Sequence, residues 1–138
     1  MFNLDLKDKV ILITGGSDGL GYASAELLSS EGANVIICGR RGDYLSEKAK
    51  TISENTNNNV LAIQADVSKA EDCKRLVEET ISKFKKIDIL VNNAGASAAA
   101  LFEDVSDKNW EDDINLKLMS TIRTVSYTHL TLPTKRIV

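Results

Sequence analysis

The feature that most constrains this chain is an alternation between short runs rich in β-branched residues and longer segments with helical spacing. The short runs are predicted as strands at Lys9–Thr14, Asn34–Gly39, Val60–Asp66 and Ile87–Asn93. Each run is almost continuously apolar, as expected for a strand that is covered on both faces. Because helical segments separate the strands, the pattern predicts an α/β fold with a parallel sheet built from strand–helix–strand units.

Apolar residues that recur every three or four positions predict the first two helices. The first helix stops near Gly32, because glycine favours the left-handed conformation that ends helices. Its apolar face consists of Leu20, Ala23, Leu27 and Leu28. The second helix is expected near residues 44–53, ahead of an asparagine-rich loop. Strands and helices together predict a Rossmann-like, doubly wound parallel sheet, truncated after about four strands.

Two further helices are predicted downstream. The third opens with a capping box, Ser68 followed by Glu71. Its apolar positions with helical spacing are Cys73, Leu76, Val77, Ile81 and Phe84. The last helix starts near Ser106 and carries Trp110, Ile114, Leu118 and Ile122 on one side. This stripe is explained either by packing on the sheet or by contact with another copy of the chain.

Composition limits the classes of function. The chain has 138 residues, enough for one domain, with 43% hydrophobic and 27% charged residues, an ordinary soluble composition. A net charge of −3 offers no basic surface for nucleic acid or an anionic membrane, and no apolar run is long enough to cross a bilayer. The N-terminus lacks the apolar region of a signal peptide, and Cys38 and Cys73 lack metal-ligand spacing. We therefore expect a cytoplasmic protein with reduced cysteines and no metal site.

The strongest local signal is TGGSDGLG, residues 14–21, between the first strand and the first helix. Glycine lets the backbone turn tightly and approach a ligand, while the N–H groups at a helix N-terminus attract a pyrophosphate. On its own, such a stretch can be a glycine-rich turn without function. Its place between a strand and a helix predicts a dinucleotide-binding turn.

Two further signals fall at the same edge of the predicted sheet. NNAG, residues 92–95, ends the fourth strand, and Asp66 and Val67 end the third. Ligands of open α/β sheets bind at the carboxyl ends of the strands, which favours a binding role for both. NNAG can also be an ordinary strand-ending turn, and Asp66 can be an acid that caps the following helix.

In this order the three signals resemble the short-chain dehydrogenase/reductase family, with TGxxxGxG, an Asp after the third strand and then NNAG. The resemblance covers Leu6 to Arg123. It implies an enzyme, usually a homo-oligomer, that transfers a hydride between a nicotinamide cofactor and a small-molecule carbonyl or secondary alcohol. It also implies that the cofactor is contacted by Thr14, Gly15, Ser17, Asp18, Gly19, Leu20, Gly21, Asp66, Val67, Asn93, Ala94 and Gly95.

The choice of cofactor is predicted from the end of the second strand. Family members that prefer NAD place an acid there, whereas this chain has Gly39 followed by Arg40 and Arg41. A planar guanidinium suits a 2′-phosphate, which an acid would repel. We therefore expect NADP(H) to be favoured over NAD(H), with solvated loop charges as the alternative meaning of the two arginines.

The catalytic motif of the family, a Tyr with a Lys four residues later on one helix, is absent from the sequence. Tyr127 is followed at that spacing by Thr131, and Lys135 lies eight positions on, beyond Pro133. The Lys of the motif lowers the pKa of the Tyr for proton exchange, which needs both on one helix face. We therefore expect this chain to bind a cofactor without turnover. A non-catalytic dinucleotide-binding or scaffold protein is the alternative.

The catalytic Asn that many family members carry is not evident either. It usually follows the aromatic residue at the start of its helix by seven positions, which from Trp110 leads to Lys117. Asn115 is two residues short of that position. An exposed helical lysine is the commoner meaning of such a residue, so Lys117 is only a weak catalytic candidate and no other is predicted.

The segment Val125 to Thr134, near the end of the chain, has an unusual possible origin at the level of DNA. It can be translated from GTC TCT TAT ACA CAT CTG ACG CTG CCG ACG, which resembles the transposase-end and adapter DNA ligated to fragments for sequencing. The segment shows no clear helical or strand periodicity, and Pro133 would interrupt either element. We therefore expect residues 1–124 to be the incomplete, N-terminal part of an NAD(P)-binding domain, and residues 125–138 to be a non-native tail. A divergent natural tail is the alternative.

Overall fold

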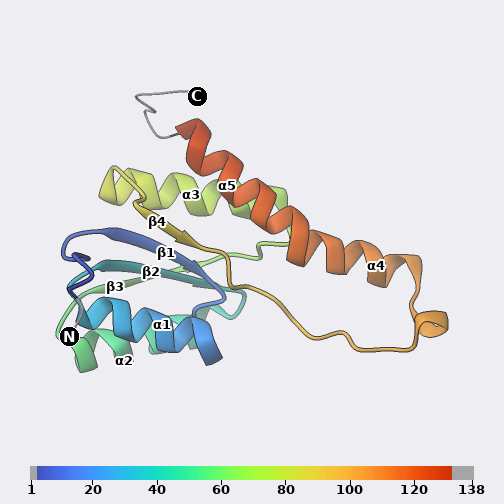
Figure 1. Ribbon diagram of the computed structural model, residues 1–138, viewed down its shortest axis with the longest axis horizontal. Coiled ribbons are helices and arrows are strands. Elements are labelled where there is room, and N and C mark those ends of the chain that lie inside the picture. The colour runs from blue at the N-terminus through green and yellow to red at the C-terminus, as the bar shows by residue number, and fades with distance from the viewer. Residues whose placement is uncertain (1–2, 132–138) are drawn as a thin grey trace.

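The computed structural model describes residues 3–131, which form one parallel sheet with helices on both faces (Figure 1). The sheet has four strands in the order β3-β2-β1-β4. Their bounds are β1 Val10–Thr14, β2 Asn34–Gly39, β3 Val60–Gln64 and β4 Ile89–Val91. The chain winds outward from β1 to β3 and then crosses back to β4, so a topological switch point lies between β1 and β4. The predicted doubly wound, Rossmann-like fold is confirmed, although β3 and β4 are shorter than predicted.

The helices form two layers around the sheet (Figure 1). One layer consists of α1 Gly19–Ser30 and α2 Gly42–Thr56, and the other of α3 Ala70–Phe84 and α5 Ser120–Thr131. Between β4 and α5 the chain leaves the body, forms a 3-10 turn, η1 Phe102–Asp104, and returns through α4 Asp107–Ile114 and one π-helical turn, η2 Asn115–Met119. Within residues 3–131, no helix has both the length and the apolar character that a membrane crossing requires.

The sheet divides the core into two clusters, because successive side chains of a strand point to opposite faces. Ile11, Ile13 and Ile37 pack on the side of α1 and α2, whereas Leu12 and Ile36 pack on the side of α3. The apolar face predicted for the third helix is confirmed: Cys73, Leu76 and Val77 are buried, and Ile81 and Phe84 are partly buried against the same cluster. Both cysteines are buried and free, as predicted.

The apolar face predicted for the first helix is wrong. Leu20 and Leu27 are 82% and 61% exposed, and the residues of α1 that are buried are Gly21, Ala25 and Ser29. The start of the helix lies so close to the preceding turn that a Cβ atom on Gly21 would be 2.2 Å from the carbonyl oxygen of Gly15. Small residues therefore face inward, and Leu20 and Leu27 point away from the sheet, whereas Leu28 is partly buried against the core as predicted.

The predicted capping box of the third helix is also wrong. The Ser68 hydroxyl donates a 2.7 Å hydrogen bond to Asp66, and α3 starts after Lys69 without a side-chain cap. A capping box does occur at α4, where the predicted start near Ser106 is confirmed. There the N–H of Asn109 donates to the Ser106 hydroxyl, and the N–H of Ser106 donates to the Asn109 side chain.

The last helix continues through Val125 to Thr131, so the expectation of no regular element beyond Arg123 is wrong. Its buried face is small and polar, with Ser120, Thr124 and Thr128, and Tyr127 packs against the core on the α3 side. The hydroxyls of Ser120, Thr124 and Thr128 each donate to the backbone carbonyl four residues earlier, which allows their burial without loss of hydrogen bonding. Pro133 and Lys135 lie outside the described residues.

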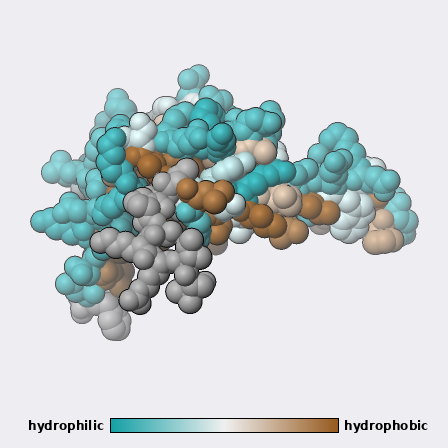
Figure 2. All heavy atoms as spheres, turned by 90° about the horizontal axis from the view of Figure 1, so that it is seen from above, coloured by the Kyte–Doolittle hydropathy of each residue, from teal (hydrophilic) through white to brown (hydrophobic). Residues whose placement is uncertain are grey.

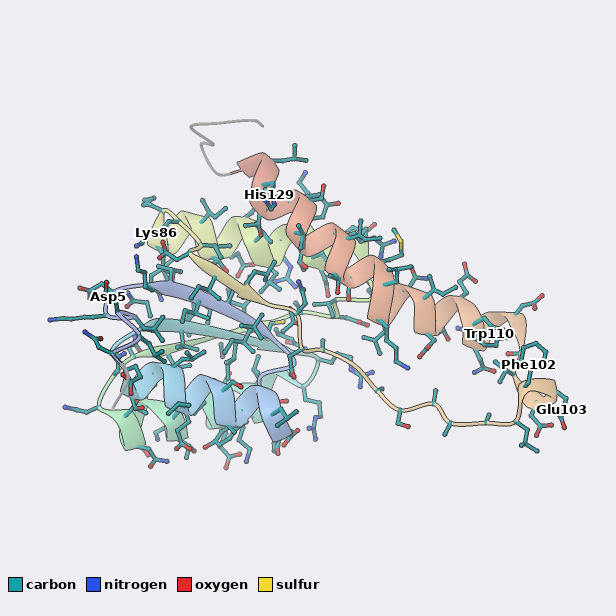
Figure 3. The ribbon with its side chains drawn as sticks, in the orientation of Figure 1. Asp5, Lys86, Phe102, Glu103, Trp110 and His129 are labelled. Atoms are coloured by element: carbon teal, nitrogen blue, oxygen red, sulfur yellow. The ribbon has the colours of Figure 1, made fainter. Side chains whose placement is uncertain are left out.

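The predicted apolar stripe of the last helix does not pack on the sheet. Trp110, Ile114, Leu118 and Ile122 are between 45% and 55% exposed. A row of hydrophobic spheres runs from the body along the projecting segment (Figure 2). At its far tip, Phe102 and Trp110 lie beside each other with ring centroids 6.1 Å apart (Figure 3). In the structure of residues 3–131 the stripe is therefore uncovered, and contact with another copy of the chain stays a prediction.

Candidate functional site

A cleft of about 320 Å³ opens at the carboxyl ends of the strands, beside the switch point. Its walls are the turn after β1 and the ends of β2, β3 and β4. Among the predicted cofactor contacts, the structure brings together Gly15, Ser17, Asp18, Gly19, Arg40, Arg41, Asp66, Val67, Asn93, Ala94 and Gly95. Thr14, Leu20 and Gly21 do not line the cleft. The remaining lining residues are Cys38, Gly39, Ala65 and Leu116. Of these, the sequence singled out only Gly39 for cofactor binding, at the position where an acid would favour NAD.

Two glycines fix the shape of the turn after β1. Gly19, the first residue of α1, has a φ of +54°, a backbone conformation that L side chains rarely adopt. Gly21 faces the carbonyl oxygen of Gly15 at a distance that excludes a Cβ atom. The turn therefore lies close against the helix start, and its backbone is accessible from the cleft.

A lock of four hydrogen bonds ties the turn after β1 to the end of β4. The buried Thr14 hydroxyl accepts from the backbone N–H groups of Asn93 and Ala94, both at 3.0 Å. The Asn93 side-chain amide donates to the carbonyl oxygens of Thr14, at 3.1 Å, and Gly15, at 3.0 Å. These side chains hold the floor of the cleft in place. The Thr14 hydroxyl and the Asn93 side-chain N–H groups are therefore already engaged in hydrogen bonds within the protein.

The helix start next to this floor is open to an anion. Asp18 occupies the N-cap position of α1, yet its carboxylate makes no capping hydrogen bond. Within the described residues, no side chain therefore caps the first N–H groups of the helix. Unpaired N–H groups at a helix N-terminus, together with the helix dipole, attract phosphate.

The β3 side of the cleft carries Asp66, which does not cap α3. Its carboxylate accepts from the N–H of Ser68 at 3.1 Å and from the Ser68 hydroxyl at 2.7 Å. The N–H of Asp66 donates to Asp72 at 2.7 Å, and this hydrogen bond lowers the pKa of the Asp72 carboxyl below its ordinary value. The N-cap residue of α3 is Lys69, so the capping interpretation of Asp66 is wrong.

The two arginines after β2 differ in their contacts. The Arg41 guanidinium lies 4.0 Å from the ring centre of Tyr44 and forms a 2.7 Å ion pair with Asp18. Arg40 is exposed, and its backbone carbonyl accepts a 2.9 Å hydrogen bond from Gln64. Within residues 3–131 no carboxylate pairs with the Arg40 guanidinium. Both arginines line the cleft.

Lys117, the weak catalytic candidate, does not line the cleft. Its ammonium pairs with Asp113 at 2.7 Å, and the side chain is about half exposed. The neighbouring Leu116 reaches the cleft instead. Both lie in η2, and π-helical turns inside α-helices occur frequently at functional sites. A catalytic role for Lys117 stays a prediction.

The cleft is suited to binding rather than to nucleophilic or metal chemistry. Burial raises the pKa of the Cys38 thiol to about 12, so it carries a proton at neutral pH and is a poor nucleophile. Among the described residues, no group of His, Cys, Asp and Glu side chains could hold a metal ion. What the cleft offers is a set of open N–H groups, two aspartates, Asp18 and Asp66, and two guanidinium groups, arranged along one edge of the sheet.

Comparison with known proteins gives the family. The sequence pattern described as short chain dehydrogenase matches residues 9–134. The chain belongs to the short-chain dehydrogenase family. An 11-beta-hydroxysteroid dehydrogenase 1A of Arabidopsis thaliana is 41% identical over 107 residues, which are 78% of this chain and 31% of that protein. An uncharacterized oxidoreductase of Staphylococcus saprophyticus is 37% identical over 123 residues, which are 89% of this chain and 53% of that protein.

Solved short-chain dehydrogenase structures share the fold. The L-sorbose reductase of Gluconobacter frateurii, complexed with NADPH and L-sorbose, superposes with a TM-score of 0.91 at 32% identity and covers 95% of this chain. An RhlG/NADP complex of Pseudomonas aeruginosa gives a TM-score of 0.84 at 32% identity and covers 91% of this chain. This chain spans 50% and 48% of those two structures. It therefore spans between about a third and a half of the length of the proteins that it matches.

Proposed function

We propose that this chain is the NADP(H)-binding part of a short-chain oxidoreductase that reduces a small-molecule carbonyl or oxidises a secondary alcohol. The observation that carries the proposal is the pair of arginines at the rim of the cleft, with Gly39 where an acid would disfavour a 2′-phosphate. The NADPH and NADP complexes of the two solved relatives support the same cofactor.

Each wall of the cleft suits one part of the nucleotide. The open N–H groups at the start of α1 would hold the pyrophosphate. Asp66 and Val67 would lie beside the adenine, and residues 93–95 would continue along the cofactor toward its nicotinamide. When bound, the nicotinamide supplies the hydride exchange with the substrate carbon. The residues of this chain bind and orient; we propose no proton transfer by them.

We propose that the chain as given does not turn over substrate. Tyr127 is followed by Thr131 at the spacing where the family places Lys. In the described part of the chain, Tyr127 packs against the core rather than lining the cleft. An assay with NADPH and a broad panel of ketones and aldehydes should show no consumption of NADPH above the buffer rate. Clear reduction of any carbonyl would contradict the proposal.

Binding is tested separately from turnover. NADPH fluorescence should increase and shift to shorter wavelength as the chain is added, and NADP⁺ should displace NADPH at lower concentration than NAD⁺. Equal displacement by both would leave a dinucleotide site and remove the NADP preference. No fluorescence change at any protein concentration would overturn the site itself.

We further propose that the exposed stripe of Trp110, Ile114, Leu118 and Ile122 contacts a second copy of the chain. These four large apolar side chains are half exposed and form one continuous row. A continuous exposed apolar patch marks an interaction surface, whereas scattered single apolar residues do not. Sedimentation of the chain should therefore show a concentration-dependent dimer or larger species. The double variant Leu118→Ser with Ile122→Ser should shift the population toward monomer, because it removes apolar area from the contact.

The nature of residues 125–138 separates the enzyme from the alternative, a non-catalytic binding or scaffold protein. We propose that these residues are not native, because Val125 to Thr134 can be translated from adapter DNA. Resequencing the source DNA across the Arg123 codon decides this point. A frame that continues into a Tyr-x-x-x-Lys helix supports the enzyme, whereas a frame that reads through to Val138 and stops supports the alternative. The cytoplasmic location stays a prediction.

A further inference from the structure

Asp18 connects the two loops that form the rim of the cleft. One carboxylate oxygen accepts a 2.7 Å hydrogen bond from the Arg41 guanidinium, and the other accepts a 2.5 Å hydrogen bond from the Tyr44 hydroxyl. Two cations lie near the Tyr44 ring, with the Arg41 guanidinium 4.0 Å from its centre and the Lys48 ammonium 5.1 Å from it. The first turn of α1 is thereby tied to the first turn of α2 by a charged cluster of Asp18, Arg41, Tyr44 and Lys48.

The position of Asp18 makes this contact unusual. An aspartate at the N-cap of a helix normally accepts from the helix N–H groups, but Asp18 makes no such hydrogen bond and turns toward α2. The hydrogen bond from Tyr44, helped by the charge of Arg41, lowers the pKa of the Asp18 carboxyl below its ordinary value. Asp18 is therefore a full negative charge at neutral pH, and it lines the cleft together with both arginines.

A phosphate group and the Asp18 carboxylate would compete for the same donors. A phosphate monoester presents three acceptor oxygens and suits the planar fork of a guanidinium. Arg41 is already paired, and a second anion near Asp18 would be repelled by it. The Arg40 guanidinium has no ion pair within the described residues and lines the same cleft. The two arginines are therefore not equivalent toward an incoming anion.

We propose that Asp18 is a specificity-determining residue that weakens the preference for NADP by holding Arg41 in an ion pair. Under this arrangement, which rests on the function proposed above, a 2′-phosphate binds first to Arg40 and gains Arg41 only when Asp18 releases it. NAD lacks the 2′-phosphate, so it does not compete with Asp18 for the Arg41 guanidinium. Its effect falls on the ratio of the two affinities rather than on nucleotide binding as such.

The test is the ratio of the dissociation constants for NAD⁺ and NADP⁺, measured by calorimetry with the chain and three single variants. Asp18→Asn should raise this ratio roughly threefold, the range expected when one exposed ion pair is removed. Asp18 is exposed and asparagine is an equally good N-cap residue, so the variant should fold as the parent does. Arg41→Gln alone should change the ratio little. In the double variant with Asp18→Asn, it should lower the ratio roughly threefold relative to Asp18→Asn alone.

Asp43→Asn is the matched control, because Asp43 is an exposed aspartate in the first turn of α2 that forms no ion pair within residues 3–131. It removes the same charge and should leave the ratio unchanged. Three results would each overturn the inference. The ratio could stay unchanged in Asp18→Asn, or the two aspartate variants could change it equally. Arg41→Gln could also have the same effect with and without Asp18→Asn. A parent chain that prefers NAD⁺ while Asp18→Asn still raises the ratio upholds the inference and removes only the proposed NADP preference. A parent chain that binds neither nucleotide overturns the proposed function, and the inference with it.

Discussion

The two sides of the cleft are built in different ways. The side formed by the turn after β1 and the end of β4 is held by glycines in close contact and by the hydrogen bonds between Thr14 and Asn93. The side formed by the ends of β2 and β3 carries Arg40 and Arg41, which are exposed, and Asp66, which is half-buried. The first side has a backbone of fixed shape with one ionised group, Asp18, at its rim, whereas the second carries most of the charged side chains of the cleft.

In the proposed nucleotide site, each side of the cleft suits a different task. A fixed backbone surface with open N–H groups suits the pyrophosphate, which every nicotinamide dinucleotide has. Exposed charges on the other side suit discrimination between nucleotides that differ by one phosphate. Substitutions on the fixed side should therefore weaken the fold and all nucleotides together, whereas substitutions on the charged side should change the choice of nucleotide and leave the fold intact.

The largest effect is expected on the fixed side, for Gly21→Val. The added Cβ would lie 2.2 Å from the Gly15 carbonyl oxygen, a distance that forces the turn and α1 apart. Stability should fall by about 3 kcal/mol, and binding of both nucleotides should be lost. Urea unfolding and calorimetry measure the two quantities. As a control, Ala23→Val adds similar bulk to α1 at an exposed position and should leave binding unchanged.

Thr14→Val breaks the lock without adding bulk. It removes the oxygen that accepts from the N–H groups of Asn93 and Ala94 and leaves both without this partner. Stability in urea should fall by about 2 kcal/mol, with weaker binding of NAD⁺ and NADP⁺ alike. Thr14→Ser keeps the hydroxyl and should lie much closer to the parent. A valine variant as stable as the serine variant would show that the lock is unimportant.

On the charged side, Arg40→Gln should change the choice of nucleotide. Loss of a charged hydrogen bond to the 2′-phosphate should weaken NADP⁺ binding about tenfold and leave NAD⁺ binding and stability nearly unchanged. Arg75→Gln removes the same charge from a guanidinium outside the cleft, and it should not alter the ratio of the two affinities. Equal weakening of both nucleotides by Arg40→Gln would contradict the division between the two sides.

At neutral pH the smallest effect is expected for Cys38, which is buried at the end of β2 beside the cleft. Burial raises the pKa of its thiol to about 12 from 9.0, so above pH 9 the unfolded chain loses this proton while the folded chain keeps it. The stability contributed by this group is fully present below pH 9 and declines toward pH 12, by at most about 1.4 kcal/mol per pH unit. Cys38→Ala should flatten the decline between pH 9 and 11 in urea unfolding and leave the slope below pH 8 unchanged. The same slope in both proteins would show that the thiol titrates alike in the two states.

The sequence was sufficient for the sheet and for the position of the cleft. Continuous apolar runs predicted the strands, and the glycine-rich turn and NNAG predicted the edge at which ligands bind. The lock between Thr14 and Asn93 was not predictable, because it joins residues 79 positions apart whose polar groups could equally have faced a ligand. The ion pair between Asp18 and Arg41 was missed for the same reason, since it depends on how two loops meet.

Helix faces were predictable only where large side chains face the core. In α3 the large apolar residues are buried, as their spacing predicted. In α1 and α5 the fully buried residues are small, such as Ala25 and Thr124, while Leu20, Leu27 and Ile122 point outward and Leu28 and Tyr127 are only partly buried. Close packing of a helix against its neighbour excludes large side chains, and hydrophobicity alone does not reveal this. The same small-residue face explains why the helix beyond Arg123 was not predicted.

The central claim is that a nicotinamide dinucleotide binds along both sides of the cleft at once. Amide chemical-shift mapping by nuclear magnetic resonance, with the chain titrated by NADP⁺, tests it most directly. The account predicts that the largest shifts fall on the amides of residues 15–21, 39–41, 66–67 and 93–95, and that NAD⁺ reproduces them except near Arg40. Shifts confined to the exposed stripe of α4 and α5, or no shifts at saturating NADP⁺, would contradict it.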